Sequence, residues 1–407
     1  MENSSILDQI ISNHQAEEVA KLDGVEVINN LFSELSERER DVLSRRFGLT
    51  GENRETLEEI GKAHKLTRER IRQIETSSIK RLRLLNNLDD YLSGLKNVIT
   101  HLLEEHGGLM EKEYLFNNLV NFSLGAGKRG DNEIKHKRYF DFLISRLLPD
   151  EFEEINNSPY FKNSFKLTYR SLEHLEELAA ELLRKIKETK KIFLTDELIN
   201  LSKELAAYKK HQAKFNQPAS LDISGALAND LFEEKTELVN QNKAIYSIFQ
   251  AAREIEQNRF GHWGQASSRE IKPKTINDKI YLVLKNSGKP MHFAEIADRI
   301  NQISFDRKKA NAATVHNELI LDEKYILVGR GLYGLKEWGY RKGTVADVIE
   351  KVITEVGRAL SREEIIEKVL GQRLVKKATI NLALMNREKF ELVGGDKYYL
   401  KNSAEIK

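Results

Sequence analysis

The residues best suited to chemistry are cations gathered in one short stretch. Between Lys62 and Arg83 the chain holds eight lysine or arginine residues against only Glu69 and Glu75, so the stretch nets +6 in a chain whose formal charge is +2. Clustered cations neutralise phosphate groups, and the stretch therefore predicts a nucleic-acid-binding surface. A solvated helix face is the alternative that the charge alone leaves open.

Catalytic and ligand-binding patterns are absent or incomplete. The segment 125–130 matches GxGxxG, but it follows a helical pattern and not a strand, and Glu151 and Glu153 are expected at the polar end of another helix, so we predict a loop. The ten histidines form no HExxH motif and no serine lies in GxSxG. The absence of cysteine excludes disulfides and thiolate zinc sites. We therefore expect no enzyme, no metal site and no small-molecule cofactor.

The basic stretch lies in a segment with readable helix starts and stops. Ser36 and Thr56 each begin a capping box, with a glutamate three positions on that can reach back to the cap. Gly48 can end the first helix in a left-handed conformation. A break at residues 64–66 separates the second helix from a third, which Thr67 caps. A short helix, a tight turn and a longer basic helix are the pattern of a helix-turn-helix.

The third helix has two faces at helical spacing. The inward, apolar face comprises Ile71, Ile74, Ile79 and Leu82. The outward, polar face comprises Arg68, Glu69, Arg72, Gln73 and Thr76. Arginine matches guanine, glutamine pairs with adenine and glutamate accepts from cytosine, so we predict that the outward face lies in a major groove of double-stranded DNA. Lys80 and Arg81, further along the helix, suit phosphates or a protein partner.

These motifs resemble region 4 of the sigma-70 family over residues 28–85. The resemblance is carried by LSERERDVL (35–43), RFGL (46–49), TLEEIG (56–61) and TRERIRQIE (67–75). It implies that the segment reads the −35 promoter element and docks on the flap of the beta subunit of bacterial RNA polymerase core. The positions that match the family's base-contacting residues are Arg68, Glu69 and Gln73. Those that match its DNA-backbone or polymerase contacts are Thr67, Arg70 and Arg72, to which Lys80 and Arg81 are added.

Only about 27 residues precede this segment. Such a length is too short for the helical domains that hold the polymerase clamp and open the −10 element in complete sigma factors. We therefore expect a sigma-like reader that does not melt a promoter by itself.

The remainder of the chain repeats a second pattern. Residues 288–300 align with 357–369, and a third copy starts at Ile99. A fourth, weaker copy includes Ile186 and Ile199. Each copy predicts a helix, a glycine-marked turn, two further helices and two strands around a glycine turn, which is the winged-helix plan.

One of these copies resembles a known domain. The copy at about 275–340, with Gly288-Lys289-Pro290-Met291 and the tyrosine–glycine wing at 331–335, resembles the HARE-HTH domain also found in the delta subunit of Gram-positive RNA polymerase. The resemblance implies further association with transcription machinery.

The predicted fold class is mainly α, a helix-turn-helix followed by tandem winged-helix modules of small α+β type. We expect an N-terminal tail, the helix-turn-helix, a winged-helix-like unit, a helical unit for which a degenerate winged helix is one alternative, the HARE-HTH-like unit and a C-terminal winged helix. Their expected ranges are 1–27, 28–90, 91–172, 173–272, 273–342 and 343–402.

The wings carry modest basic clusters. We assign Arg307, Lys308 and Lys309 to the third helix of the HARE-HTH-like unit and Arg330 to the tip of its wing, with Arg307, Lys308 and Arg330 as candidate DNA contacts. The last unit offers Arg373, Lys376, Lys377 and Lys397. Winged helices that bind protein or act as spacers are the alternative. Trp263 and Trp338, each expected after a wing, are assigned to packing.

The functional expectation is a sequence-specific protein that binds double-stranded promoter DNA at a −35-like element and contacts RNA polymerase in bacterial transcription initiation. The alternative is a polymerase-associated or anti-sigma-like interaction protein whose modules bind protein instead of DNA. No apolar run approaches the ~18 residues of a membrane span and the N-terminus has no signal pattern. We therefore expect no membrane partner and a cytoplasmic, nucleoid-associated location.

Overall fold

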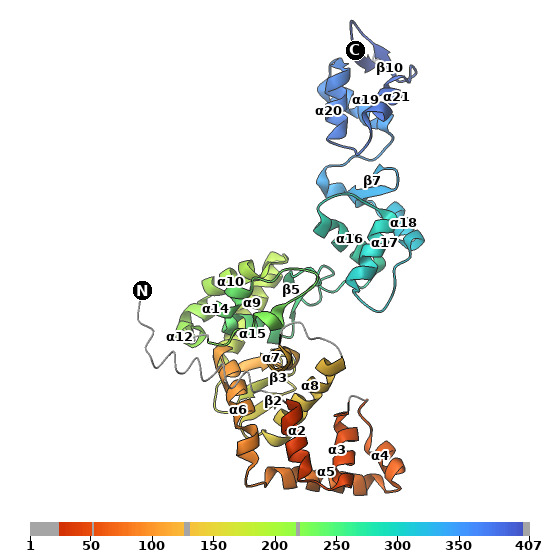
Figure 1. Cartoon of the computed structure of the whole chain (residues 1–407). Coiled ribbons are helices and arrows are strands. Elements are labelled where there is room, and N and C mark those ends of the chain that lie inside the picture. The colour runs from red at the N-terminus through yellow and green to blue at the C-terminus, as the bar shows by residue number, and fades with distance from the viewer. Residues whose placement is uncertain (1–23, 51–52, 126–130, 217–219, 402–407) are drawn as a thin grey trace. The chain divides into compact units, whose positions relative to one another are not determined.

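The computed structural model describes residues 24–50, 53–125, 131–216 and 220–401. These divide between residues 267 and 268 into two compact units, which are described separately (Figure 1). The described residues form mostly helices together with small antiparallel sheets. The expected fold class, mainly α with a helix-turn-helix followed by small α+β winged modules, is confirmed.

The described part of the first unit begins with four helices, one of which the sequence patterns did not predict. They are α2 (Gly24–Ser33), α3 (Glu37–Phe47), α4 (Leu57–His64) and α5 (Arg68–Arg83). The unpredicted helix is α2, whose buried residues include Ile28, Leu31 and Phe32. It packs against later helices of the same unit and thereby ties the start of the described chain to the winged module that follows.

The first winged module spans residues 88–167. Its elements are α6 (Leu88–Glu105), β1 (Leu109–Glu111), α7 (Lys112–Leu124), α8 (Asp131–Phe142), the π-helical turn η1 (Leu143–Leu147), β2 (Phe152–Ile155) and β3 (Ser164–Leu167). The last strand lies in the middle of the sheet, in the order β1-β3-β2, with Met110 opposite Phe165 and Phe152 opposite Leu167. All four of these side chains are buried, so the hairpin closes over the helices.

The second winged module spans residues 173–265 and carries a helical insertion. Its elements are α9 (Glu173–Thr189), α10 (Thr195–Glu204), α15 (Lys243–Ala251), β4 (Ile255–Gln257) and β5 (Trp263–Gln265). A single bridge between Phe193 and Trp263 stands where the other winged modules have their first strand. The insertion between α10 and α15 holds α11 (Ala206–Lys210), α12 (Gln212–Phe215), α13 (Ser224–Leu227) and α14 (Thr236–Gln241).

Trp263 anchors this second module. Its side chain is 1% exposed and its Nε1 donates to Thr195 Oγ1 at 3.0 Å. The residue lies in the second strand of the hairpin, not after it as the sequence analysis placed it, while its assignment to packing agrees with its burial. Trp338 of the second unit is half-buried.

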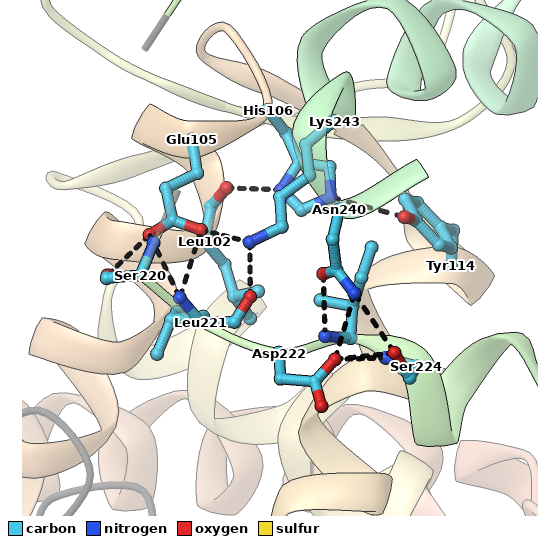
Figure 2. Close-up of polar contacts among 11 residues, drawn as sticks. Leu102, Glu105, His106, Tyr114, Ser220, Leu221, Asp222, Ser224, Asn240 and Lys243 are labelled. Carbon is cyan, nitrogen blue, oxygen red and sulfur yellow. Dashed lines mark hydrogen bonds and ion pairs between the residues drawn. The ribbon is translucent and has the colours of Figure 1, made fainter. Parts of the chain in front are cut away.

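A buried ion pair fastens the insertion to both winged modules of the first unit (Figure 2). Glu105, at the end of α6, accepts a hydrogen bond of 2.5 Å from Lys243 at the start of α15. The same carboxylate accepts from the Ser220 amide and hydroxyl at 2.6 Å, and Lys243 also donates to the Leu221 carbonyl. Beside them His106 donates to the Leu102 carbonyl. This network fixes the insertion because each of its charges is satisfied only when all three segments are in place.

The second unit holds two more winged modules, at 276–335 and 345–400. The first consists of α16 (Ile276–Ser287), β6 (Met291–His292), α17 (Phe293–Ile303), α18 (Ala312–Leu321), β7 (Tyr325–Gly329) and β8 (Leu332–Leu335), followed by the 3-10 turn η2 (Lys336–Trp338). The second consists of α19 (Val345–Val356), β9 (Leu360–Ser361), α20 (Arg362–Leu370), α21 (Lys377–Leu384), β10 (Phe390–Leu392) and β11 (Lys397–Leu400).

The two modules share their topology and their turn glycines. The sheet orders are β6-β8-β7 and β10-β11-β9, so the last strand is again central in each. Gly288 and Gly357, which the repeat alignment placed in register, both end the first helix with a positive φ, of 65° and 68°. In the described part of the chain no helix combines the length and apolar character that a bilayer crossing needs.

Candidate nucleic-acid interface

The predicted helix starts are present as complete hydrogen-bonded caps. The Ser36 amide donates to Glu39 at 2.8 Å and the Glu39 amide donates back to the Ser36 hydroxyl at 3.4 Å. Thr56 and Glu59 repeat the pair at 2.7 and 3.3 Å. The Thr67 hydroxyl accepts from the Arg70 amide at 3.2 Å. Each cap satisfies N–H groups that a helix start otherwise leaves without a partner, and thereby sets where α3, α4 and α5 begin.

The turn between α4 and α5 needs a close backbone approach. Lys65 adopts a left-handed conformation with φ 54°, and the Leu66 amide donates to the Gly61 carbonyl at 2.8 Å. A Cβ on Gly61 would lie 2.8 Å from the Leu66 carbonyl oxygen, so a side chain there would push the two helices apart. This glycine therefore sets the angle at which α5 leaves the turn.

A small core orients α5 within the module. Val42, Ile60, Ile71 and Ile74 form a buried cluster, with Leu57 and Leu66 packed against it. Leu82, further along α5, is fully buried in a different and larger core. The inward face predicted from the spacing is thus the face that the structure buries, and the opposite face of the first half of α5 is left outward.

The side chains expected to face a DNA groove are exposed. Thr67, at the start of α5, is exposed together with Arg68, Glu69, Arg70, Arg72, Gln73 and Thr76. Within the described residues the Arg68 guanidinium forms no hydrogen bond or ion pair. A partner can reach this face of the first unit without displacing a buried side chain.

Two of the predicted readers are held by neighbours on the same helix. Arg72 donates to both oxygens of Glu69, at 2.9 and 2.7 Å, and Arg70 donates to Gln73 at 3.1 Å. The hydrogen bonds from Arg72 hold the pKa of Glu69 below its ordinary value. These pairs lie on the solvent face, where they exchange readily for contacts with a ligand.

Three cations lie at the end of α5, and two of them, Arg81 and Arg83, contact other residues of the protein. Lys80 is exposed. Arg81 lies 3.5 Å from Glu39, and Arg83 donates to the Arg146 carbonyl of the first winged module at 2.6 Å. Among the described residues the Lys80 side chain forms no hydrogen bond or ion pair, so of these three cations it is the one that can bind a phosphate without giving up a partner.

One cation near the interface was missed by the sequence reasoning. A hollow of about 380 Å³ beside α5 is lined by Arg46, Thr56, Leu57, Glu58 and Arg68. Arg46 comes from the last turn of α3 and lies 3.6 Å from Glu75. Its place in this hollow follows from the packing of α3 on α5, which a pattern read along one helix does not reveal.

The comparisons with known proteins converge on this module. The family model described as "Sigma-70, region 4" matches residues 31–84. Residues 31–84 form a sigma-70 region 4 domain. The match takes in α3, α4 and α5 together with the last three residues of α2.

Similar proteins match the chain over the region 4 domain alone. RNA polymerase sigma factor SigA1 of Synechococcus elongatus is 51% identical over 67 residues, which cover 16% of this chain and 17% of that protein. SigA of Lactococcus lactis subsp. cremoris is 50% identical over 58 residues, 14% of this chain and 16% of that one. RpoD of Helicobacter pylori is 54% identical over 57 residues, 14% of this chain and 8% of that one. The chain thus spans less than a fifth of these relatives, and no solved structure matches it.

The third helices of the four winged modules expose different surfaces. In α8, the side chains of His136, Tyr139, Phe140 and Phe142 are buried. In α15, all residues except Gln250 are buried. By contrast α18 exposes Thr314 and Asn317 together with the apolar Ile320 (60%) and Leu321 (79%), and the last module exposes Leu382 (69%) in α21 and Met385 (73%) directly after that helix.

Two assignments of cations to the winged modules are corrected. Arg307, Lys308 and Lys309 are exposed but precede the third helix, because α18 begins at Ala312 with Asn311 as its cap. Arg330 lies exposed in the turn between β7 and β8, as expected.

Arg373 is not a surface cation. It is 6% exposed and donates to the Gly343 carbonyl and, at 3.0 Å, to the Leu327 carbonyl of the preceding module. Burial lowers the pKa of Arg373. The other predicted cations of the last unit, Lys376, Lys377 and Lys397, are exposed.

Of the glycine-rich segment, Gly125 alone lies among the described residues. Gly125 ends α7 with φ 78°, while residues 126–130 lie outside the described residues. Glu153 lies in strand β2 opposite Lys166, with which it forms an ion pair of 2.8 Å, so its assignment to a helix end was wrong. Its neighbour Phe152 is buried, which is the alternation of a strand. Among the described residues no group of three ligating side chains could hold a metal ion.

Proposed function

We propose that this chain is a sequence-specific double-stranded DNA-binding protein of bacterial transcription initiation, which reads a −35-like promoter element and contacts core RNA polymerase. The observation that carries the proposal is the region 4 domain at residues 31–84 with the first half of α5 exposed. An exposed, basic second helix of a helix-turn-helix is the element that such modules place in the major groove. The assignment of the polymerase contact to the beta flap is part of the same proposal.

Each side chain of this face has a proposed role. Arg68 and Gln73 would read guanine and adenine, and Glu69 would accept from cytosine. Thr67, Arg70 and Arg72 would contact the DNA backbone, and Lys80 and Arg81 would contact phosphates or polymerase. On binding, Glu69 and Gln73 exchange their helix partners for bases, which releases Arg70 and Arg72 towards phosphates.

The experiment compares binding to a −35-like duplex and to a scrambled duplex at several salt concentrations. Arg68→Ala should cost about 1–3 kcal/mol on the −35-like duplex and relax the preference for it, because a base contact is lost. Lys80→Ala should weaken both duplexes alike and reduce the salt dependence by about one phosphate contact. Arg184→Ala, an exposed residue of α9, is the matched control. Equal affinity of the wild-type chain for both duplexes would refute base reading.

A second DNA contact is proposed for the winged module at 276–335. Its third helix α18 exposes Thr314 and Asn317, whereas α15 is almost entirely buried. Arg307 and Lys308, in the loop before α18, and Arg330, at the wing tip, are exposed. Such a surface suits phosphates on either side of a groove. The triple substitution to alanine should shorten the footprint on a long promoter fragment and leave the −35-like protection intact; an unchanged footprint refutes this contact. We also propose that the module is HARE-HTH-like, on the support of its Gly288 turn and its wing.

A protein-binding role is the second candidate, and α21 favours it. Leu382 of α21 and Met385, which directly follows the helix as its C-cap, are both exposed, and exposed apolar side chains of this kind suit packing against a partner. The DNA-binding and protein-binding functions are distinguished by measuring capture of core RNA polymerase and duplex binding in the same salt. Under either proposal the chain acts in the cytoplasm at the nucleoid, without a catalytic activity or a cofactor.

A further inference from the structure

The region 4 domain has a second, apolar face that its own small core does not cover. This face comprises Phe32, Leu35, Leu43, Phe47 and Leu49, each no more than 8% exposed. These side chains belong to the large core that continues into the winged modules, whereas the domain's own cluster holds Val42, Ile60, Ile71 and Ile74. Phe32 and Phe47 of this face are covered by another part of the chain, and Leu82 of α5 belongs to the same core.

The covering elements are α8 and η1 of the first winged module. The ring of Phe142 lies 6.0 Å from that of Phe32 in an edge-to-face arrangement and 4.9 Å from that of Phe47. The Arg146 guanidinium lies 5.5 Å from the centre of the Phe47 ring. An aromatic centre with a cation at its edge is the composition of protein–protein interfaces.

Polar contacts surround this aromatic centre. Arg54 forms an ion pair of 2.7 Å with Asp141 of α8. Arg138 of α8 donates to the Gly48 carbonyl at 2.9 Å, and Arg83 donates to the Arg146 carbonyl at 2.6 Å. The third helix of this winged module, the element that winged helices present to DNA, therefore packs against the region 4 domain.

The covered face lies inside the segment shared with sigma factors, and its cover lies outside it. Residues 31–84 contain all five side chains of the face, whereas α8 and η1 fall beyond the match. A domain that reads DNA with α5 and contacts polymerase at the same time needs a second face, and this aromatic face is the one suited to protein. We propose that α8 and η1 are a built-in cap that competes with RNA polymerase for the second face of the region 4 domain. This inference rests on the proposed function, because it takes from it that the region 4 domain contacts RNA polymerase.

The test locks and releases the cap in one protein. The chain has no cysteine, so R54C/D141C carries two thiols across the cap, which a reducible bismaleimide can join. The linked protein should bind core RNA polymerase about tenfold more weakly than the same protein after reduction. Binding to the −35-like duplex should be equal in the two states, because the cap leaves α5 exposed. R184C/E188C, linked within α9, is the matched control and should show no change.

A second variant opens the cap without touching its apolar centre. R54E places like charge against Asp141, and Arg54 is an exposed side chain. It should raise polymerase affinity about fivefold over wild type. Equal polymerase affinity of R54C/D141C before and after reduction, or no gain in R54E, overturns the cap alone. Absence of polymerase binding in every state refutes both the cap and the polymerase contact of the proposed function.

Discussion

Removal of either member of the buried Glu105–Lys243 ion pair should destabilise the first unit, and by unequal amounts (Figure 2). The two side chains are 8% and 1% exposed. Breaking a buried ion pair costs about 3–5 kcal/mol, because one charge is left in the interior without its counter-charge. Where in this range each substitution falls depends on the partners that the remaining group keeps.

The remaining partners differ for the two residues. Without Lys243, the Glu105 carboxylate still accepts from the Ser220 amide and hydroxyl at 2.6 Å and from the Leu221 amide at 3.2 Å. Without the Glu105 charge, the Lys243 ammonium keeps the Leu221 carbonyl alone. K243M should therefore cost about 3 kcal/mol and E105Q about 5 kcal/mol. The double variant should cost clearly less than the sum of about 8 kcal/mol, because no buried charge remains.

The assay is urea unfolding followed by tryptophan fluorescence in a W338F background. The chain has two tryptophans, so this background leaves Trp263, which lies in the first unit and is 1% exposed. Free energies of unfolding come from linear extrapolation of each transition. A K243M cost equal to or above that of E105Q would refute the argument from remaining partners, and additive costs would refute the coupling of the pair.

Three further outcomes test the helix-turn-helix and the first unit. Burial lowers the pKa of His106 to about 3 from its ordinary 6.5, so below pH 6.5 the unfolded chain takes up a proton that the folded chain does not. The contribution of His106 to the free energy of unfolding is complete above pH 6.5 and should fall by about 1.4 kcal/mol per pH unit as the pH drops towards 3. H106Q should reduce this slope when melting is measured as a function of pH. G61A should lower both the melting temperature and duplex affinity, because its Cβ meets the Leu66 carbonyl oxygen; wild-type values for both would contradict the close approach. T195V should cost about 1–3 kcal/mol in urea unfolding by leaving the Trp263 Nε1–H without its acceptor, and a neutral effect would count against that hydrogen bond.

The region 4 domain was readable from the sequence because its determinants are local. A serine or threonine with a glutamate three positions on favours a helix start by local hydrogen bonds, and the capping boxes of Ser36 and Thr56 form as predicted, as does the simpler cap of Thr67. Helical spacing likewise separates Ile71 and Ile74 from the exposed side chains of α5. Turn glycines such as Gly288 and Gly357 mark repeats because their left-handed conformation suits no other residue as well.

Some features required the tertiary structure because they depend on what lies against a helix. The periodicity of α8 indicates an apolar face, but not that this face packs on Phe47 and Phe32 through Phe142. Arg373 has the sequence context of a surface cation, and only the fold brings two carbonyls to it.

The sequence alone therefore determined the helix starts, the turns and the exposed basic face of α5. Tertiary packing decided which winged modules still expose a third helix. Burial requires two surfaces in contact, and the sequence of one helix describes only the surface of that helix.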